Sequence, residues 1–255
     1  MQIDGIWRHP IKSHGRQALD MITLRAGASM PWDRVWAVAH EAATAQPGVW
    51  AKCVNFSRVS KAPALMAITA KLNETTGIVT LSHPDRPDLT FDPDTNPDAL
   101  IGWTAPLVPQ DRSLPSTIMR LDGHGYTDSD FPSVTLCNRA SHRAVESEIG
   151  TDLSIHRWRG NLWFDSDTPW IEFDWLGQEV QVGGAILRPR ERTDRCLATT
   201  TNPENGRRDV DTLAALDSFG HQDFSVRCEV VKSGDIQFGD TVNWVRRGDR
   251  CKFLK

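Results

Sequence analysis

The stretch VWAVA at residues 35–39 opens a series of short β-type runs that decides the fold class. Similar runs follow at 65–70 (LMAITA), 78–81 and 89–91. Gly, Pro, Asn and Asp separate these runs, and short strands at such spacing favour a β-barrel or a sandwich. We therefore expect the first part of the chain to be a β-barrel domain.

The second half continues this strand pattern and adds two helices. Segment 138–149 (NRASHRAVESEI) has apolar residues near helical spacing, with Asn138 as its candidate N-cap. A shorter helix is expected at 212–216. The strand-like segments are 170–175, 179–182, 185–187 and 224–231, followed by a hairpin-like unit at 234–245. The whole chain is therefore expected to be mainly β with a few helices, in two parts.

A boundary is expected near residues 105–115, because segment 106–115 begins and ends with Pro. The Pro- and Asp-rich segment 85–98 before it is interpreted as turns around one strand. This division predicts three parts. They are an N-terminal β-barrel domain at 1–105, a β-barrel-like domain at 106–247 and a basic C-terminal tail at 248–255.

Composition limits the classes of function. A chain of 255 residues with 39% hydrophobic and 24% charged residues is long and apolar enough to form a globular core. The net charge of -4 argues against a nucleic-acid-binding protein. No run approaches the apolar length of a membrane span, and the start lacks a signal-peptide pattern, so we expect a cytoplasmic protein without a membrane partner. The five cysteines include no CxxC pair, which disfavours a zinc knuckle or a disulfide framework.

Cys196 ends the segment RPRERTDRC at residues 188–196 and begins a polar loop. Six arginines lie between residues 188 and 208, and nearby guanidinium charge stabilises a thiolate that can bind a soft metal. The turn Asn205-Gly206 is expected to bring the last two arginines back, so that residues 188–208 form one wall of a site. The alternative is a buried thiol beside a solvated basic loop.

Two further clusters are candidates for binding an anion. Lys12 and Ser13 place an ammonium beside a hydroxyl, and Arg34 follows in the same half of the chain. The simpler alternative for this pair is a solvated strand end. The segment RWRGN at 157–161 has two arginines and an amide, and its alternative is an exposed cross-strand pair.

The ordered series of motifs resembles the MOSC family, over roughly residues 3–245. Members include the mitochondrial amidoxime-reducing components, related bacterial proteins and the C-terminal part of eukaryotic molybdenum-cofactor sulfurase. The first part is similar to the MOSC N-terminal β-barrel domain and the second to the MOSC domain, and the resemblance implies that the site lies in the cleft between them. The matching pieces are GIWRHPIKS (5–13), WDRVWAVAHE (32–41), RWRGNLWFD (157–165), PWIEFDWLGQEVQVGGA (169–185), RPRERTDRC (188–196), NPENGRRDVDTLAAL (202–216) and SGDIQFGDTV (233–242).

The resemblance implies a molybdenum cofactor (Mo-molybdopterin) and a set of site residues. Cys196 is the implied molybdenum ligand, and Asp194 lies beside the pterin as a second candidate for catalysis. The implied cofactor-binding residues are Lys12, Ser13, Arg34, Pro132, Ser133, Arg159, Asn161, Arg195 and Arg208. Relatives often have Ser or Thr near position 194, and an acid there would repel phosphate unless it pairs with an Arg or accepts pterin N–H groups.

The resemblance implies an oxidoreductase that reduces N-hydroxylated compounds such as amidoximes and hydroxylamines. Two alternatives stay open: a carrier of the cofactor or of persulfide, and a non-catalytic anion-binding module. The family is also associated with pyridoxal phosphate binding. No cysteine cluster suits an iron–sulfur centre, so a separate electron donor of the ferredoxin, flavodoxin or cytochrome-reductase type is expected. Lys52, Arg58 and Lys61 have no assigned role, and the other four cysteines are expected to be inert.

Overall fold

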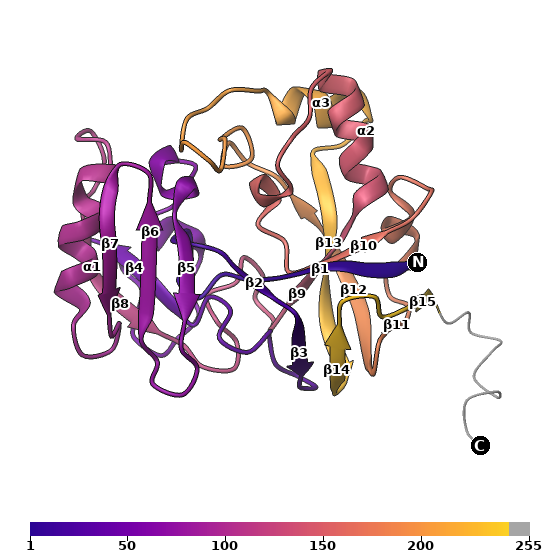
Figure 1. Cartoon of the computed structure of the whole chain (residues 1–255), viewed down its shortest axis with the longest axis horizontal. Coiled ribbons are helices and arrows are strands. Elements are labelled where there is room, and N and C mark those ends of the chain that lie inside the picture. Colours follow the sequence, from indigo (N-terminus) through magenta and orange to yellow (C-terminus); the bar gives the residue numbers. More distant parts are fainter. Residues whose placement is uncertain (245–255) are drawn as a thin grey trace.

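The computed structural model describes residues 1–244 and shows two lobes side by side (Figure 1). An eight-stranded sheet forms the framework of the second lobe. Its strands, in spatial order, are β15 (Val242–Trp244), β11 (Val180–Val182), β12 (Ala185–Asp194), β13 (Asp223–Lys232), β9 (Val134–Asn138), β10 (Leu162–Asp165), β1 (Gln2–Arg8) and β2 (Gln17–Leu19). Strands β1 and β2 come from the start of the chain, so the two halves of the sequence are interleaved.

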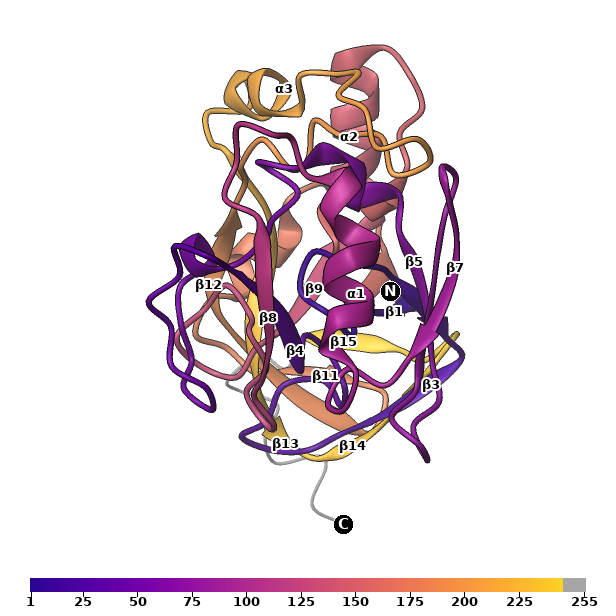
Figure 2. The ribbon, with the colours of Figure 1, turned by 90° about the vertical axis from the view of Figure 1, so that its left-hand side faces the viewer.

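The first lobe is built from smaller sheets and one helix. Helix α1 (Pro97–Thr104) packs against β7 and β8 (Figure 2) and buries Leu100 and Trp103. The strands of this lobe are β5 (Thr69–Leu72), β6 (Val79–His83) and β7 (Arg86–Phe91) in one sheet, and β4 (Trp36–His40) with β8 (Pro115–Arg120) in another. Strand β8 lies beyond residue 105 yet pairs with β4, so the first lobe uses chain from both sides of the expected boundary. The boundaries themselves stay a prediction.

Helix α2 (Arg139–Ile149) confirms the helix expected from the apolar spacing. The side chain of Asn138 accepts a hydrogen bond from the backbone N–H of Ala140 at 3.0 Å, as an N-cap does. Gly150 ends the helix with a φ of 79°, a left-handed conformation that glycine adopts without steric cost. Helix α3 (Thr212–Ser218) confirms the second expected helix.

One strand prediction is wrong, another is displaced along the chain, and a helix was missed. Residues Ile171–Trp175 form a 3-10 helix in place of the predicted strand, after Trp170, whose backbone is left-handed with a φ of 64°. Residues Pro63–Ala67 also form a 3-10 helix, because Pro63 favours a helical start, so the strand predicted at 65–70 begins only at Thr69, as β5. Helix α1 begins inside the segment interpreted as turns, since a Pro at a helix start looks like a turn signal. The remaining 3-10 helices are η1 (Cys53–Asn55), η3 (Ala105–Leu107) and η4 (Ile155–Trp158).

The hairpin expected at 234–245 is also wrong. Strand β14 (Gly234–Gln237) pairs with β3 (Met21–Leu24), whereas β15 pairs with β11. The strands thus join different parts of the molecule, which local sequence does not reveal. Residue 245 and the predicted tail at 248–255 lie outside the described residues. In residues 1–244, none of the helices combines the length and the apolar character that crossing a bilayer requires.

Candidate functional site

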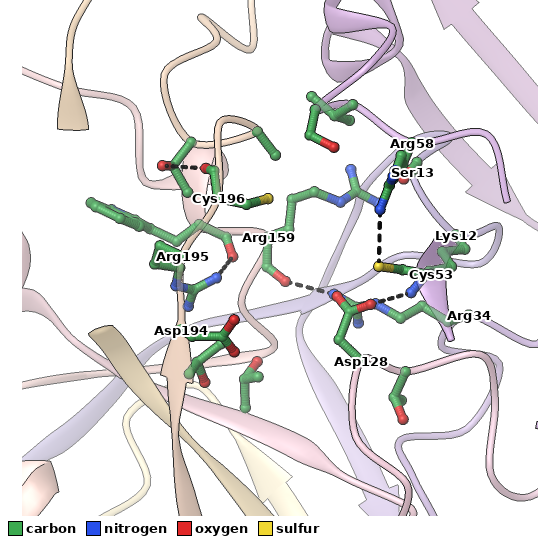
Figure 3. Close-up of a pocket in the computed structure, with 18 of the residues that line it drawn as sticks. Lys12, Ser13, Arg34, Cys53, Arg58, Asp128, Arg159, Asp194, Arg195 and Cys196 are labelled. Atoms are coloured by element: carbon green, nitrogen blue, oxygen red, sulfur yellow. Dashed lines mark hydrogen bonds and ion pairs between the residues drawn. The ribbon is translucent and has the colours of Figure 1, made fainter. Parts of the chain in front are cut away.

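A cavity of about 420 Å³ lies where the two lobes meet, and residues from both lobes line it (Figure 3). Nine of the eleven predicted site residues are among them. They are Lys12, Ser13, Arg34, Ser133, Arg159, Asn161, Asp194, Arg195 and Cys196. The other two, Pro132 and Arg208, do not line the cavity. Pro132 precedes Ser133, which does line it, and Arg208 donates a hydrogen bond to the backbone oxygen of Ser60 at 2.9 Å.

Cys196 lies two residues beyond the end of β12, and its side chain is exposed at the cavity. The backbone N–H and the hydroxyl of Thr199 both donate to the Cys196 carbonyl at 3.1 Å, which holds the turn. Its exposure excludes the alternative of a buried small apolar residue. Cys137 and Cys228 fit that description instead, because burial raises the pKa of Cys137 to about 12 and also raises the pKa of Cys228.

The prediction that residues 188–208 form one wall of the site holds only for the part around Cys196, because the lining residues of this segment all lie between positions 193 and 199. Of the six arginines in that segment, Arg195 alone lines the cavity. The arginines on β12 point elsewhere and have partners of their own. These partners are Glu179 for Arg188 at 2.9 Å, Glu229 for Arg190 at 2.8 Å, and the Phe173 ring for Arg192 at 4.2 Å. Two of these arginines, Arg188 and Arg190, are therefore paired with glutamates on the surface of the sheet and add no free charge to the cavity.

Arg195 itself is bound to the protein framework. Its guanidinium donates to the backbone oxygens of Trp158 at 2.9 Å and Phe224 at 2.6 Å, and to the Ser225 hydroxyl at 2.8 Å. Burial lowers the pKa of Arg195 to about 10. These bonds tie the residue before Cys196 to strand β13 and to η4, so Arg195 positions the thiol rather than offering a free cation.

Arg159 is the predicted site residue whose guanidinium keeps an unpartnered nitrogen at the cavity. Its Nη2 donates to the Gly15 carbonyl at 3.3 Å, but its buried Nη1 has no partner. Burial and the neighbouring charge of Arg34 lower the pKa of Arg159 to about 9. In Figure 3 its side chain lies between Cys196 and the loop that carries Arg58. A bound anion would satisfy the orphaned N–H and offset the repulsion between the guanidinium groups.

Three predicted site residues have a strained backbone. The φ angles of Ser13, Arg34 and Arg159 are 64°, 53° and 50°, in the left-handed region that non-glycine residues seldom adopt. Such a conformation costs on the order of 1 kcal/mol and is held by surrounding contacts. For Arg34 these include a hydrogen bond to the Arg159 carbonyl at 2.8 Å and an ion pair with the buried Asp33. Three of the six non-glycine residues with a left-handed backbone in residues 1–244 therefore line the cavity where the sequence predicts an anion.

Lys12 and Asp194 each have a charged partner. The Lys12 ammonium contacts the Asp128 carboxylate at 2.6 Å and the Tyr126 carbonyl at 2.8 Å. Asp194, whose side chain is 83% exposed, accepts a hydrogen bond from Arg227 at 2.8 Å. The condition set for an acid at position 194, pairing with an arginine, is thus met.

Asn161 and Ser133 line the cavity with polar groups that already have partners. The Asn161 amide accepts from the backbone N–H of Thr135 at 3.1 Å and donates to the Trp7 carbonyl at 3.2 Å. The Ser133 hydroxyl accepts from Ser129 at 2.6 Å. The side chains of Asn161 and Ser133 hold the cavity wall together. The alternative of an exposed cross-strand pair for Arg157 and Arg159 is wrong, because Arg157 is buried in a 3-10 helix and pairs with Asp209 at 2.7 Å.

Sequence reasoning missed five lining residues that bear on charge or thiol chemistry. They are Lys52, Cys53, Arg58, Asp128 and Arg227. The Arg58 guanidinium lies 3.4 Å from the sulfur of Cys53, a cysteine to which the sequence assigned no role. The basic residues left unassigned between positions 40 and 61 were the available signal.

The cavity as a whole is electropositive. Eight lining residues are basic and two are acidic, which favours a large anion. Within residues 1–244 no group of three or more His, Cys, Asp or Glu side chains could hold a metal ion alone. A metal here would therefore need ligands from a bound cofactor in addition to Cys196.

Two family models match the chain. The model described as MOSC N-terminal beta barrel domain matches residues 1–105, and the model described as MOSC domain matches residues 124–243. No curated protein matches the sequence. Two similar solved structures are YiiM from Geobacillus stearothermophilus and the YuaD protein from Bacillus subtilis.

The likeness to both solved structures is distant. YiiM shares 18% identity with a TM-score of 0.34, and the alignment covers 45% of this chain and 55% of that one. YuaD shares 11% identity with a TM-score of 0.48, and the alignment covers 94% of this chain and 93% of that one. The assignment to a family therefore rests on the two family models.

Proposed function

The chain belongs to the MOSC family, and from that premise we propose that it is a molybdenum-cofactor-dependent oxidoreductase that reduces N-hydroxylated compounds. Amidoximes and hydroxylamines are the substrate class. The observation that carries the proposal is a single cavity that combines an exposed thiol, Cys196, with an unpartnered guanidinium nitrogen on Arg159.

The residues present fit such a cofactor. Cys196 would supply one metal ligand, since a thiolate is a ligand of soft metals. Arg159 would hold the phosphate through its free Nη1, and Ser13 and Lys12 line the same cavity. When bound, the cofactor supplies two-electron oxygen-atom transfer.

The chain's own residues would orient the thiol and the bound cofactor and neutralise the negative charge of that cofactor. Arg195 and Thr199 hold the backbone on either side of the thiol, so the sulfur has a defined position. Asp194, held by Arg227, offers carboxylate oxygens that can accept N–H groups of a bound pterin or substrate. The surplus of cations neutralises an anionic cofactor inside the cavity. Electrons would come from a separate donor protein.

The decisive experiment measures reduction of benzamidoxime by purified protein of known molybdenum content, with a reduced viologen dye as electron donor. We expect turnover by the wild-type protein and its loss in Cys196→Ser. Leu197→Ser is the matched control, because Leu197 is the exposed neighbour of Cys196 and does not line the cavity. Absence of turnover in a protein that is fully loaded with molybdenum would rule the reductase out.

A second candidate function is a sulfur carrier that holds persulfide on Cys196 without reducing a substrate. The observation that favours it is the second thiol, Cys53, in the same cavity. Mass spectrometry of peptides containing Cys196, combined with molybdenum analysis, separates the two functions. Persulfide on Cys196 in molybdenum-free protein would support the carrier and count against the reductase.

A further inference from the structure

A second hollow, of about 130 Å³, lies behind Arg58 in the first lobe. Three basic side chains line it, and none of its lining residues is acidic. The polar and basic residues are His40, Ser57, Arg58, Lys61, Arg112 and Ser113. Arg58 also lines the main cavity, so one guanidinium borders both spaces.

Ser57 contributes a hydroxyl without a partner. The residue is 7% exposed, and its backbone N–H donates to the Val38 carbonyl at 2.8 Å. Its buried Oγ makes no hydrogen bond within residues 1–244. Because Ser57 lines the hollow and its hydroxyl has no other partner there, this hydroxyl is free to bond to a ligand that reaches it.

His40 contributes an unpartnered acceptor. Its Nε2 lies 2.8 Å from the Val54 carbonyl, and because a carbonyl can only accept, Nε2 must carry the hydrogen. In the neutral ring Nδ1 then has a free lone pair, and this buried atom also lacks a partner. The hollow therefore combines several donors with one acceptor.

The positive charge around the hollow is largely uncompensated. Among residues 1–244, neither Arg58 nor Lys61 has an acidic side chain within ion-pair distance. Arg112 lies 3.5 Å from Asp111, but both side chains are exposed, and exposed pairs contribute little free energy and exchange readily. All three cations can therefore turn toward a ligand.

We propose that this hollow is a binding site for inorganic phosphate in its hydrogen-phosphate form. The three cations and the Ser57 hydroxyl match the charged oxygens. The His40 lone pair matches the single P–OH hydrogen, which sulfate lacks at neutral pH. The hollow is small, so it suits a single tetrahedral anion better than a nucleotide or a pterin.

Because Arg58 borders both spaces, binding in the hollow is linked to the chemistry of the main cavity. The Arg58 guanidinium lies beside the Cys53 sulfur at 3.4 Å. A phosphate that recruits Arg58 removes a positive charge from that thiol. Phosphate therefore lowers the reactivity of Cys53, since the thiolate is the reactive form.

The first experiment counts phosphate sites by equilibrium dialysis of the full chain with radiolabelled phosphate at neutral pH and constant ionic strength. We expect Arg112→Gln to weaken binding at one site about tenfold and Ser57→Ala about fivefold, as expected for a charge-assisted and a neutral hydrogen bond. The control Lys71→Gln removes an exposed lysine on β5, outside the hollow, and should leave binding unchanged. Sulfate should compete several-fold less well than phosphate.

A further variant and a second ligand show which cavity binds the phosphate and whether the hollow takes the free ion or a phosphate ester. In Arg159→Gln any anion binding in the main cavity is weakened, while the site in the hollow should persist. Glycerol 3-phosphate should bind more weakly than inorganic phosphate if the hollow takes the free ion. The proposal is overturned if Arg159→Gln abolishes all phosphate binding, or if Arg112→Gln and Ser57→Ala both bind phosphate as the wild type does.

The second readout is the rate at which iodoacetamide modifies Cys53, followed by peptide mass spectrometry. We expect phosphate to slow this rate several-fold in the wild type, and Arg112→Gln to need about tenfold more phosphate for the same effect. The rate at which Cys196 is modified is measured in the same digest, and a change in that rate would indicate phosphate bound in the main cavity. An equal effect of phosphate on Cys53 in both proteins would contradict the link through Arg58.

Discussion

Two arginine-bearing segments of this protein look alike in sequence and behave in opposite ways. Residues 188–195 carry four arginines in a β-strand and the turn after it. On the surface of the sheet, two of them form ion pairs with glutamates and a third lies over the Phe173 ring. Residues 157–159 carry two arginines in and after a short 3-10 helix, and Arg159 enters the cavity with a free nitrogen. A run of charge along the chain is therefore a poor guide to charge in a site, whereas a strained turn is a better one.

The strongest test of this contrast replaces one arginine of each segment by glutamine and compares the molybdenum content of the two variants. We expect Arg159→Gln to lower the molybdenum retained after purification about tenfold or more, because it removes the free charged donor. Arg188→Gln, from the strand segment, should retain the wild-type amount. Circular dichroism checks that both variants are folded.

Lys12→Ala sharpens the same test on the opposite wall, and we expect it also to lower molybdenum retention. The effect should be smaller than for Arg159→Gln, because Lys12 already shares its charge with Asp128. Unchanged molybdenum content in both the Arg159 and the Lys12 variants would show that the phosphate binds elsewhere.

Within the strand segment, the contrast is between Arg195 and Arg190. Arg195→Met leaves the buried carbonyls of Trp158 and Phe224 without donors, so we expect a loss of about 4 kcal/mol in the free energy of unfolding. Arg190→Gln breaks an exposed pair with Glu229 and should cost less than about 1 kcal/mol. Urea unfolding measures both, and similar values for the two variants would refute the framework role of Arg195.

The pH dependence of stability should reflect the tight packing beside Ser13. Burial lowers the pKa of His14 from 6.5 to about 4, so the unfolded chain takes up a proton at a higher pH than the folded one. Stability is then lost as the pH falls from about 6.5 to 4, by at most about 3 kcal/mol for this group. His14→Asn, which can still donate to the Lys12 carbonyl, should flatten urea-unfolding profiles in this window. His124→Asn is the control, and a profile flattened equally by it would contradict the assignment.

The smallest expected effect concerns the strained turn itself. Ser13→Gly relieves the left-handed φ of 64°, and we expect a gain of roughly 0.5 to 1 kcal/mol in stability after the entropy of the unfolded chain is included. Ser218→Gly, at the end of α3, should lower stability instead. Thermal unfolding shows whether each variant is more or less stable than the wild type. A loss of stability in Ser13→Gly would mean that the turn is not strained.

The amino-acid sequence by itself determined the β-rich class, the capped helix after Asn138 and the ordered motifs that carry nine lining residues. These features depend on local periodicity, capping and motif order, which are present in the chain before it folds. Only the tertiary structure decided which arginines reach the cavity, that Cys53 and Arg58 line it, and where β14 and β15 pair. Those outcomes depend on which distant residues pack against each segment, because a side chain's partner is set by contacts between parts of the chain that are far apart in sequence.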